Sequence, residues 1–143
     1  MTVIAWDGKT LAADKQSTAQ NLRRTVTKIH RIRGELFATT GAGAHCCAML
    51  EWFEGDRDPA KWPKQTDEDN YGNVIQVTRN GVFQWYGNGL PVPEPLEDKF
   101  MAFGCGRDFA IAAMHLGKSA REAVEIACVY DINCGNGVDV LTL

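Results

Sequence analysis

Three dipeptides that end in glycine lie between pairs of short segments rich in β-branched and aromatic residues. They are Asp7-Gly8, Arg33-Gly34 and Asn80-Gly81. Glycine readily adopts the positive φ of tight hairpin turns, so each dipeptide predicts a turn between two antiparallel strands. The chain is therefore expected to be built on antiparallel hairpins.

The other expected elements follow from hydrophobic spacing. Strands are expected at residues 2–6, 10–13, 25–32, 35–39, 71–78, 82–86, 100–104 and 138–143. Helices are expected at residues 44–54, 107–116 and 119–129. Residues 88–97 are rich in proline and are expected to form a loop.

Two of the helices carry further signals. Phe109, Ala113 and Leu116 recur at helical spacing and predict the apolar face of one helix, which Gly117 is expected to cap. The segment Ser119-Ala120-Arg121-Glu122 is typical of a capping box at the start of the next helix.

Length and composition narrow the class of protein. A chain of 143 residues buries one core and little more, so a single domain spanning residues 1–143 is expected. The net charge of -3 argues against nucleic-acid binding. No apolar run has membrane-spanning length and no secretory leader is recognisable, so no membrane association is expected. The odd number of 5 cysteines, none at zinc-finger spacing, favours a reduced, cytoplasmic setting.

No cofactor and no metal ion are expected. The cysteines of His45-Cys46-Cys47 are adjacent and would point in different directions on a helix, which favours buried helix residues. The segment 104–107 could bind an anion ahead of a helix, but it is not a full phosphate-binding loop. Cys105 and Cys134 could be reactive thiols, although small core residues are the preferred interpretation.

The second residue, Thr2, is a candidate nucleophile. Removal of Met1 would leave Thr2 with a free α-amine at the start of a strand. A hydroxyl is a weak nucleophile, but an α-amine with a reference pKa of about 8 can accept its proton near neutral pH. Thr2 could then serve as both nucleophile and base. The alternative is that a threonine simply follows the initiator methionine.

Two charged residues are expected near Thr2. A two-residue turn at Asp7-Gly8 would pair Thr2 with Ala13, and a three-residue turn would pair it with Asp14. Either turn places a carboxylate beside Thr2. Lys28 lies on the next hairpin, where a buried ammonium would lower the proton affinity of the amine and a carboxylate would keep it charged. The alternative places Lys28 on a solvated strand face.

Six segments, in this order, resemble those of a known family. They are Thr2-Val3-Ile4-Ala5, Leu11-Ala12-Ala13-Asp14, Lys28-Ile29-His30-Arg31-Ile32, Thr40-Gly41-Ala42-Gly43, Gly104-Cys105-Gly106-Arg107-Asp108 and Asp131-Ile132-Asn133-Cys134-Gly135. On these segments, which span nearly the whole chain, it resembles the proteasome-like N-terminal nucleophile (Ntn) hydrolases, and among them the HslV/ClpQ-type peptidases. The resemblance implies an α+β fold, a four-layer α/β/β/α sandwich of antiparallel sheets.

The resemblance also implies roles for individual residues. The matching threonine, Thr2, is the nucleophile, and Asp14 and Lys28 support it. A glycine-rich turn supplies an oxyanion-hole amide, which Gly41 or Gly43 would provide here. The alternative is that these glycines only permit the turn from strand to helix.

Two more positions, Asp131 and Cys105, can be compared with the family. Asp131 matches a later acidic position that helps to hold the α-amine. Cys105 replaces the serine that is usual in the Gly-Ser-Gly segment of the family.

The function expected from the resemblance is a threonine-type peptidase acting on a peptide or unfolded protein substrate. A homo-oligomeric ring and an ATPase unfoldase are the implied partners. The chain is short between Trp52 and Asn70, where the family usually has a long helix, and this loss could change ring packing or docking. The alternatives are a catalytically silent ring or assembly protein and an amidase for small substrates.

Aromatic residues suggest a surface for neighbouring subunits, because the few expected helices cannot cover all of the apolar strands. These residues are Trp52, Phe53, Trp62, Trp85 and Tyr86. A contiguous apolar patch of this kind marks an interface, and ring symmetry would close it. The alternative is that the aromatic side chains fill the core of the domain itself.

Overall fold

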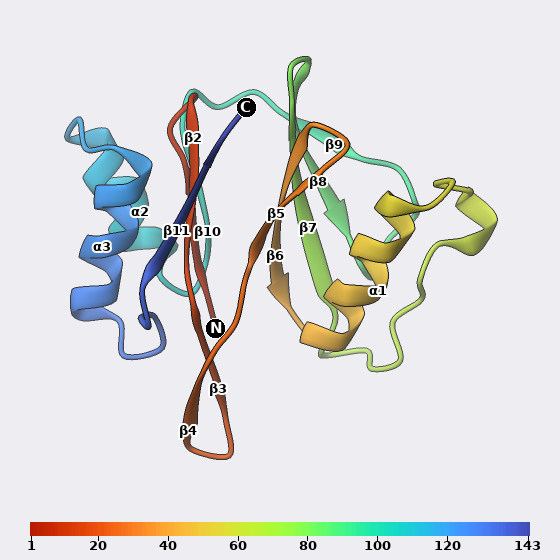
Figure 1. The fold of residues 1–143 in the computed structure, drawn as a ribbon, viewed down its shortest axis with the longest axis horizontal. Coiled ribbons are helices and arrows are strands. Elements are labelled where there is room, and N and C mark those ends of the chain that lie inside the picture. The colour runs from red at the N-terminus through yellow and green to blue at the C-terminus, as the bar shows by residue number, and fades with distance from the viewer. The chain divides into compact units, whose positions relative to one another are not determined.

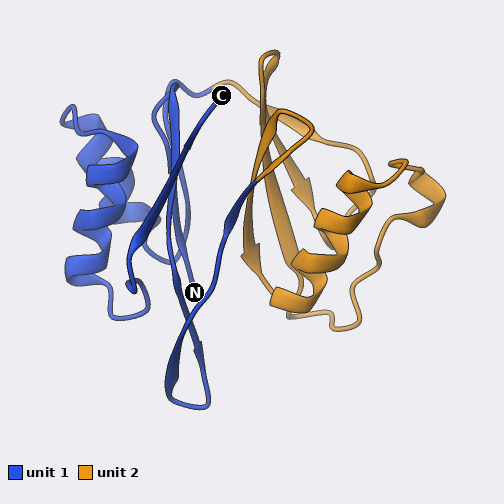
Figure 2. Ribbon diagram, viewed as in Figure 1, with its two compact units in different colours: residues 1–30, 98–143 blue, residues 31–97 orange.

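A computed structural model describes all 143 residues, Met1–Leu143. The chain divides into two compact units (Figure 2). Unit 1 combines residues 1–30 with residues 98–143, and unit 2 consists of residues 31–97. The assignment of residues 1–143 to a single domain stays a prediction.

Unit 1 contains a four-stranded antiparallel sheet with the order β10-β1-β2-β11 (Figure 1). Its strands are β1 (Val3–Trp6), β2 (Thr10–Asp14), β10 (Met101–Gly104) and β11 (Val138–Thr142). The hairpin predicted at Asp7-Gly8 is confirmed. The Asp7 carboxylate accepts hydrogen bonds from the amides of Lys9 and Thr10, which closes the turn.

A further hairpin in unit 1 was not predicted. It joins β3 (Gln16–Ala19) to β4 (Leu22–Thr25). Gln20 and Asn21 form its turn with φ values of 52° and 63°, without a glycine to signal it. The strand predicted at residues 25–32 is therefore wrong in its first half, because Thr25 ends β4 and the next strand begins only at Ile29.

Two helices, α2 (Arg107–His115) and α3 (Ala120–Tyr130), pack on the unit 1 sheet. The interface is lined by small side chains on both sides, which lets the helices approach the strands closely. The capping box at Ser119 is confirmed, and Gly117 ends α2 with a φ of 89°. The predicted face of α2 is right for Ala113 and wrong for Phe109 and Leu116, which are exposed; the buried residues are Ala110, Ala113 and Met114.

Unit 2 is built on a five-stranded sheet with the order β5-β6-β7-β8-β9. Its elements are β6 (Glu35–Gly41), α1 (Gly43–Glu54), a 3₁₀ helix η1 (Pro59–Lys61), β7 (Gly72–Thr78), β8 (Gly81–Tyr86), β9 (Glu94–Leu96) and the second half of β5 (Ile29–Ile32), whose first two residues belong to unit 1. The turn at Arg33-Gly34 is confirmed. The hairpin predicted around Asn80-Gly81 is confirmed too, but its turn residues are Arg79 and Asn80, and Gly81 begins β8. The loop predicted at residues 88–97 is only partly right, because β9 pairs with β8 there.

The prediction that aromatic residues form a subunit interface is wrong for four of its five residues. Trp52, Phe53, Trp62 and Trp85 are buried together in the core of unit 2, against α1 and the sheet. Their rings pack edge-to-face or tilted, with centroids 4.9 Å apart for Trp52 and Trp62 and 5.1 Å apart for Phe53 and Trp85. Aromatic edges and faces attract in this geometry, so the cluster is self-contained. Only Tyr86 is exposed.

No helix in the structure combines the length and the apolar character that crossing a lipid bilayer requires.

The aromatic cluster predicts where unit 2 is most sensitive to mutation. Phe53→Ala removes a fully buried ring that packs against four other rings, so the free energy of unfolding should fall by about 3–5 kcal/mol. Leu90→Ala, at an exposed position in the same unit, is the control and should change it by less than about 0.5 kcal/mol. Urea denaturation followed by tryptophan fluorescence measures both. Equal effects would contradict the assigned core.

Candidate active site

Thr2 lies directly before β1, at the end of the strand that runs through the middle of the unit 1 sheet. It is buried, whereas Met1 is exposed. The Thr2 carbonyl accepts a hydrogen bond from the amide of Gly106 at 3.2 Å. The residue is thus fixed at its backbone while the chain before it reaches solvent.

Gly104 allows this close packing. Its φ is +88°, and a Cβ atom at this position would lie 2.1 Å from the Thr2 carbonyl oxygen. No side chain fits that space, so a glycine is required where the turn after β10 meets Thr2. The Gly-Cys-Gly segment therefore holds the start of β1 in place.

Asp14 is the charged centre of unit 1, with a side-chain exposure of 0%. Its Oδ1 accepts hydrogen bonds from the Val3 amide at 3.0 Å and from the Lys28 ammonium at 2.7 Å. Its Oδ2 accepts from the amides of Gln16 at 3.2 Å and Gly135 at 3.1 Å. A buried carboxylate is tolerated only when it is paired and hydrogen-bonded in this way.

Lys28 is buried as well, and its alternative placement on a solvated strand face is wrong. Its ammonium donates to Asp14 and, at 3.0 Å, to the carbonyl oxygen of Met1. That carbonyl belongs to the peptide group whose nitrogen is the nitrogen of Thr2. The ammonium is therefore held at the bond that must be cleaved to free the Thr2 amine.

The predicted pairing of Thr2 with Ala13 or Asp14 is wrong in register. The hairpin pairs Ile4 with Ala13 and Trp6 with Leu11, so four residues rather than two or three lie between the last paired positions. Asp14 nevertheless reaches the start of β1, because its side chain accepts the hydrogen bond from the amide of Val3.

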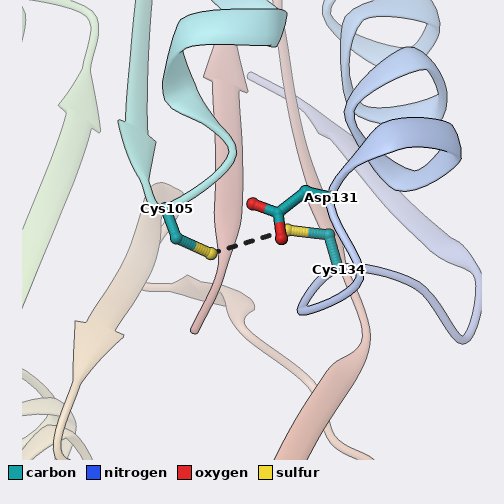
Figure 3. Close-up of side chains that lie close together, drawn as sticks. All are labelled: Cys105, Asp131 and Cys134. Atoms are coloured by element: carbon teal, nitrogen blue, oxygen red, sulfur yellow. Dashed lines mark hydrogen bonds between the residues drawn. The ribbon is translucent and has the colours of Figure 1, made fainter.

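Cys105, Asp131 and Cys134 come together beside this set (Figure 3). The Thr2 nitrogen donates to Cys105 Sγ at 3.2 Å, and the two sulfur atoms are 3.7 Å apart. A hydrogen bond from the Asn133 amide holds the pKa of the Asp131 carboxyl below its usual value. Burial raises the pKa of the Cys134 thiol, with a further contribution from the Asp14 carboxylate.

Two other cysteines are unsuited to nucleophilic chemistry. Burial raises the pKa of both the Cys46 and the Cys128 thiol to about 11. These groups are neutral near pH 7, and only a thiolate is an effective nucleophile.

The predicted oxyanion-hole glycines belong to unit 2. Gly41 ends β6 with a φ of +89°, and a Cβ atom there would lie 2.1 Å from the carbonyl oxygen of Tyr71. Gly43 begins α1, whose N-terminus has no side-chain cap. Uncapped amides at a helix N-terminus suit a developing negative charge, but the role of these glycines stays a prediction.

Three residues that contribute to this region were not predicted to do so. Gln16 and Gly135 donate backbone hydrogen bonds to Asp14, and Cys134 faces Cys105. Gly135 and Cys134 lie in the segment that matched the family, which was the available signal. The backbone amide of Gln16 could not be predicted as a donor, because nearly every residue type has a backbone N–H.

Comparisons with solved structures identify proteins that have a similar fold. No family model and no curated protein matches the sequence. The chain is similar to BPH from Thiobacillus denitrificans in complex with epoxomicin, with a TM-score of 0.75 and 19% identity, over 100% of this chain and 98% of that one. It is also similar to HslV from Trypanosoma brucei, with a TM-score of 0.70 and 21% identity, over 98% and 97% of the two chains.

A third neighbour is the Anbu (Gly-1) mutant from Hyphomicrobium sp. strain MC1, with a TM-score of 0.70 and 12% identity, over 100% of this chain and 82% of that one. The chain thus has the fold of the proteasome-type Ntn hydrolases, and its expected resemblance to HslV-like proteins is confirmed at the level of structure. The expected α+β class with antiparallel sheets is confirmed as well.

The buried ion pair predicts a clear contrast between two lysines. Lys28→Met should lower the free energy of unfolding by about 3–5 kcal/mol, because it leaves the Asp14 carboxylate buried without its ammonium. Lys15→Met is the matched control: Lys15 bridges Asp139 at 2.6 Å, but both side chains are partly exposed, so its loss should cost less than about 1 kcal/mol. Chemical denaturation measures both. Similar losses of unfolding free energy for the two variants would refute the claim that Asp14 depends on the Lys28 ammonium.

Proposed function

We propose that this chain is a threonine-type peptidase whose nucleophile is Thr2 after removal of Met1. The observation that carries the proposal is the buried Lys28 ammonium, held by Asp14 and hydrogen-bonded to the peptide group between Met1 and Thr2. A positive charge at this place favours the neutral, proton-accepting form of the freed amine. The same charge stabilises the hydroxyl oxygen as it loses its proton.

The proposed reaction is amide hydrolysis in two steps. The Thr2 amine, directly or through a water molecule, accepts the proton of the Thr2 hydroxyl, and Oγ attacks the carbonyl carbon of the substrate. Amides of Gly41 or Gly43 stabilise the oxyanion, and the proton passes to the departing amine as the peptide bond breaks. Water then attacks the ester that remains on Thr2 and releases the second product.

Asp131 and Cys105 have supporting roles in this proposal. Cys105 Sγ lies 3.2 Å from the Thr2 nitrogen, so it occupies the place of a hydroxyl that would orient the amine. The Asp131 carboxylate lies within 4.8 Å of the Cys105 sulfur, so its negative charge can help hold the amine in place. We place the protein in the cytoplasm, where its five free cysteines would stay reduced.

The first test uses protein whose mass and N-terminal sequence prove that Met1 has been removed. Thr2→Ala should abolish cleavage of fluorogenic peptides, because it deletes the hydroxyl, whereas Thr2→Ser should keep part of the turnover. Thr142→Ala, at the opposite end of the sheet near Thr10, is the control and should be as active as wild type.

Two outcomes would separate the alternatives. Activity retained by Thr2→Ala would exclude Thr2 as the nucleophile, and an inactive Met1-free protein would favour a catalytically silent assembly protein. Turnover of short amides without cleavage of unfolded protein would favour a small-substrate amidase. Epoxomicin is a useful probe, since BPH was solved in complex with it; the proposal expects it to inhibit the Met1-free chain.

We further infer a closed homo-oligomer, with an ATPase unfoldase as the partner that would supply unfolded protein. The exposed apolar side chains of unit 1 support the oligomer. Phe109 stacks on Tyr130 with ring centroids 5.8 Å apart, and Val129 and Ile132 are exposed at the end of α3. Monomers rarely leave several such side chains in water at one place.

Assembly is measured by light scattering in dilute, reducing buffer. The wild-type mass should be a multiple of the 15.8 kDa chain, and Tyr130→Asp should shift it toward the monomer. Leu90→Asp, at an exposed apolar position of unit 2, serves as the control and should leave the mass unchanged. A wild-type monomer at all concentrations would exclude the ring and the enclosed proteolytic chamber.

A further inference from the structure

Two cysteines and an aspartate converge beside Thr2, and the proposed mechanism uses only Cys105 and Asp131 of the three. Cys105 lies in the turn between β10 and α2, and Asp131 and Cys134 lie in the segment that follows α3. The sulfur atoms are 3.7 Å apart, and a carboxylate oxygen of Asp131 lies within 4.8 Å of both. Figure 3 shows the two thiols facing each other with the carboxylate beside them.

We propose that Cys105, Asp131 and Cys134 bind one Zn²⁺ ion. Thiolates 2.3 Å from a tetrahedral zinc ion lie about 3.8 Å from each other, which matches the observed sulfur separation. A disulfide would need that separation to shrink to about 2.05 Å. Two thiolates with a carboxylate form a donor set that suits zinc better than the hard ions Mg²⁺ and Ca²⁺.

The surrounding groups hold the three ligands in place. The Asn133 amide donates to Asp131 Oδ1 at 2.8 Å, which fixes one carboxylate oxygen and leaves the other for a metal ion. Cys134 Sγ packs against Gly106, where a Cβ atom would lie 3.1 Å from it. The Thr2 nitrogen donates to Cys105 Sγ, a contact that stabilises a thiolate ligand.

The site is open on one side. Cys105 is exposed, Asp131 is half-buried and Cys134 is buried, so an ion can enter past Cys105 and reach the inner thiol. Binding transfers the two thiol protons to water, so the affinity rises with pH. No change of oxidation state is involved.

The fourth ligand links this site to the nucleophile, a step that rests on the proposed function. In the chain that carries Met1, the Thr2 nitrogen is an amide and water completes the tetrahedron. After removal of Met1 the same nitrogen is an amine 3.2 Å from Cys105 Sγ, and it can take the fourth position. A coordinated amine has no free lone pair to accept the hydroxyl proton, so zinc inhibits the enzyme reversibly.

The test uses Co²⁺ as a spectroscopic substitute for zinc, added to chelator-treated, reduced protein of the full chain. We expect one Co²⁺ per chain, a thiolate-to-cobalt charge-transfer band in the near ultraviolet, and loss of that band when Zn²⁺ is added. Cys105→Ser, Cys134→Ser and Asp131→Asn should each weaken binding by at least about 10-fold, since even replacement of groups behind the ligands costs about 10–100-fold.

Matched variants keep the test specific. Cys47→Ser, at an exposed cysteine of α1, and Cys128→Ser, on α3, should bind as wild type does. Circular dichroism of each variant confirms that it is folded. Absence of the thiolate band, or unchanged affinity in the Cys105→Ser/Cys134→Ser double variant, would overturn the proposal.

The link to Thr2 is tested separately. Removal of Met1 should raise the affinity for Co²⁺ and steepen its dependence on pH, whether or not the protein cleaves peptides. If the Met1-free chain is an active peptidase, Zn²⁺ should inhibit it and Cys134→Ser should relieve that inhibition. An inactive chain that still shows the thiolate band refutes the peptidase and leaves the zinc site standing; equal affinity with and without Met1 refutes the amine ligand.

Discussion

The buried pair of Asp14 and Lys28 is the interaction on which unit 1 depends. A charge taken out of water must be compensated in full, and the Asp14 carboxylate meets this demand with four donors. Those donors come from the start of β1, the start of β3, the segment before β5 and the segment after α3. One carboxylate thereby ties together parts of the chain more than one hundred residues apart, since Gly135 lies 121 positions from Asp14.

The pair also fixes the Lys28 ammonium beside the peptide group of Thr2. Replacing a buried ion pair with apolar residues of similar volume is often neutral or stabilising, so stability alone is a weak reason to keep one. Here the ammonium has a second acceptor, the Met1 carbonyl, and the charge is therefore aimed at the peptide group of Thr2. The cost of burying Lys28 is understandable if that position needs a positive charge for chemistry.

Local signals predicted the local features of this fold. Glycine at the turns and the Ser119 capping box determine φ values or caps within a few residues, and the structure has them. The register of the first hairpin could not be predicted, because the Asp7 side chain closes a longer turn than the dipeptide suggests. The turn at Gln20 and Asn21 was missed, because neither residue is the glycine that usually marks positive φ.

Long-range packing decided what local patterns could not. Apolar spacing gives the period of a helix but not which large side chains the neighbouring elements have room for. α3 and the sheet meet α2 through Ala110 and Ala113, and Phe109 is therefore left outside. The tryptophans of unit 2 show the reverse, since α1 and the sheet enclose a space that only large rings fill.

In the candidate site, too, some residues could be predicted from the sequence and others only from the fold. Thr2, Asp14 and Lys28 could be named because the expected hairpins place them near one another and because the segments that contain them resemble those of a known family. Cys134 could not, because a lone cysteine in sequence is usually a small apolar residue. Only the fold brings it 3.7 Å from Cys105. Cys105, in place of the serine usual in the family, therefore changes the chemistry available at the Thr2 nitrogen. A serine hydroxyl at this position would orient the amine. In the proposed zinc site, the ion held by the two thiolates and the carboxylate would also bind the amine and block its role as a base.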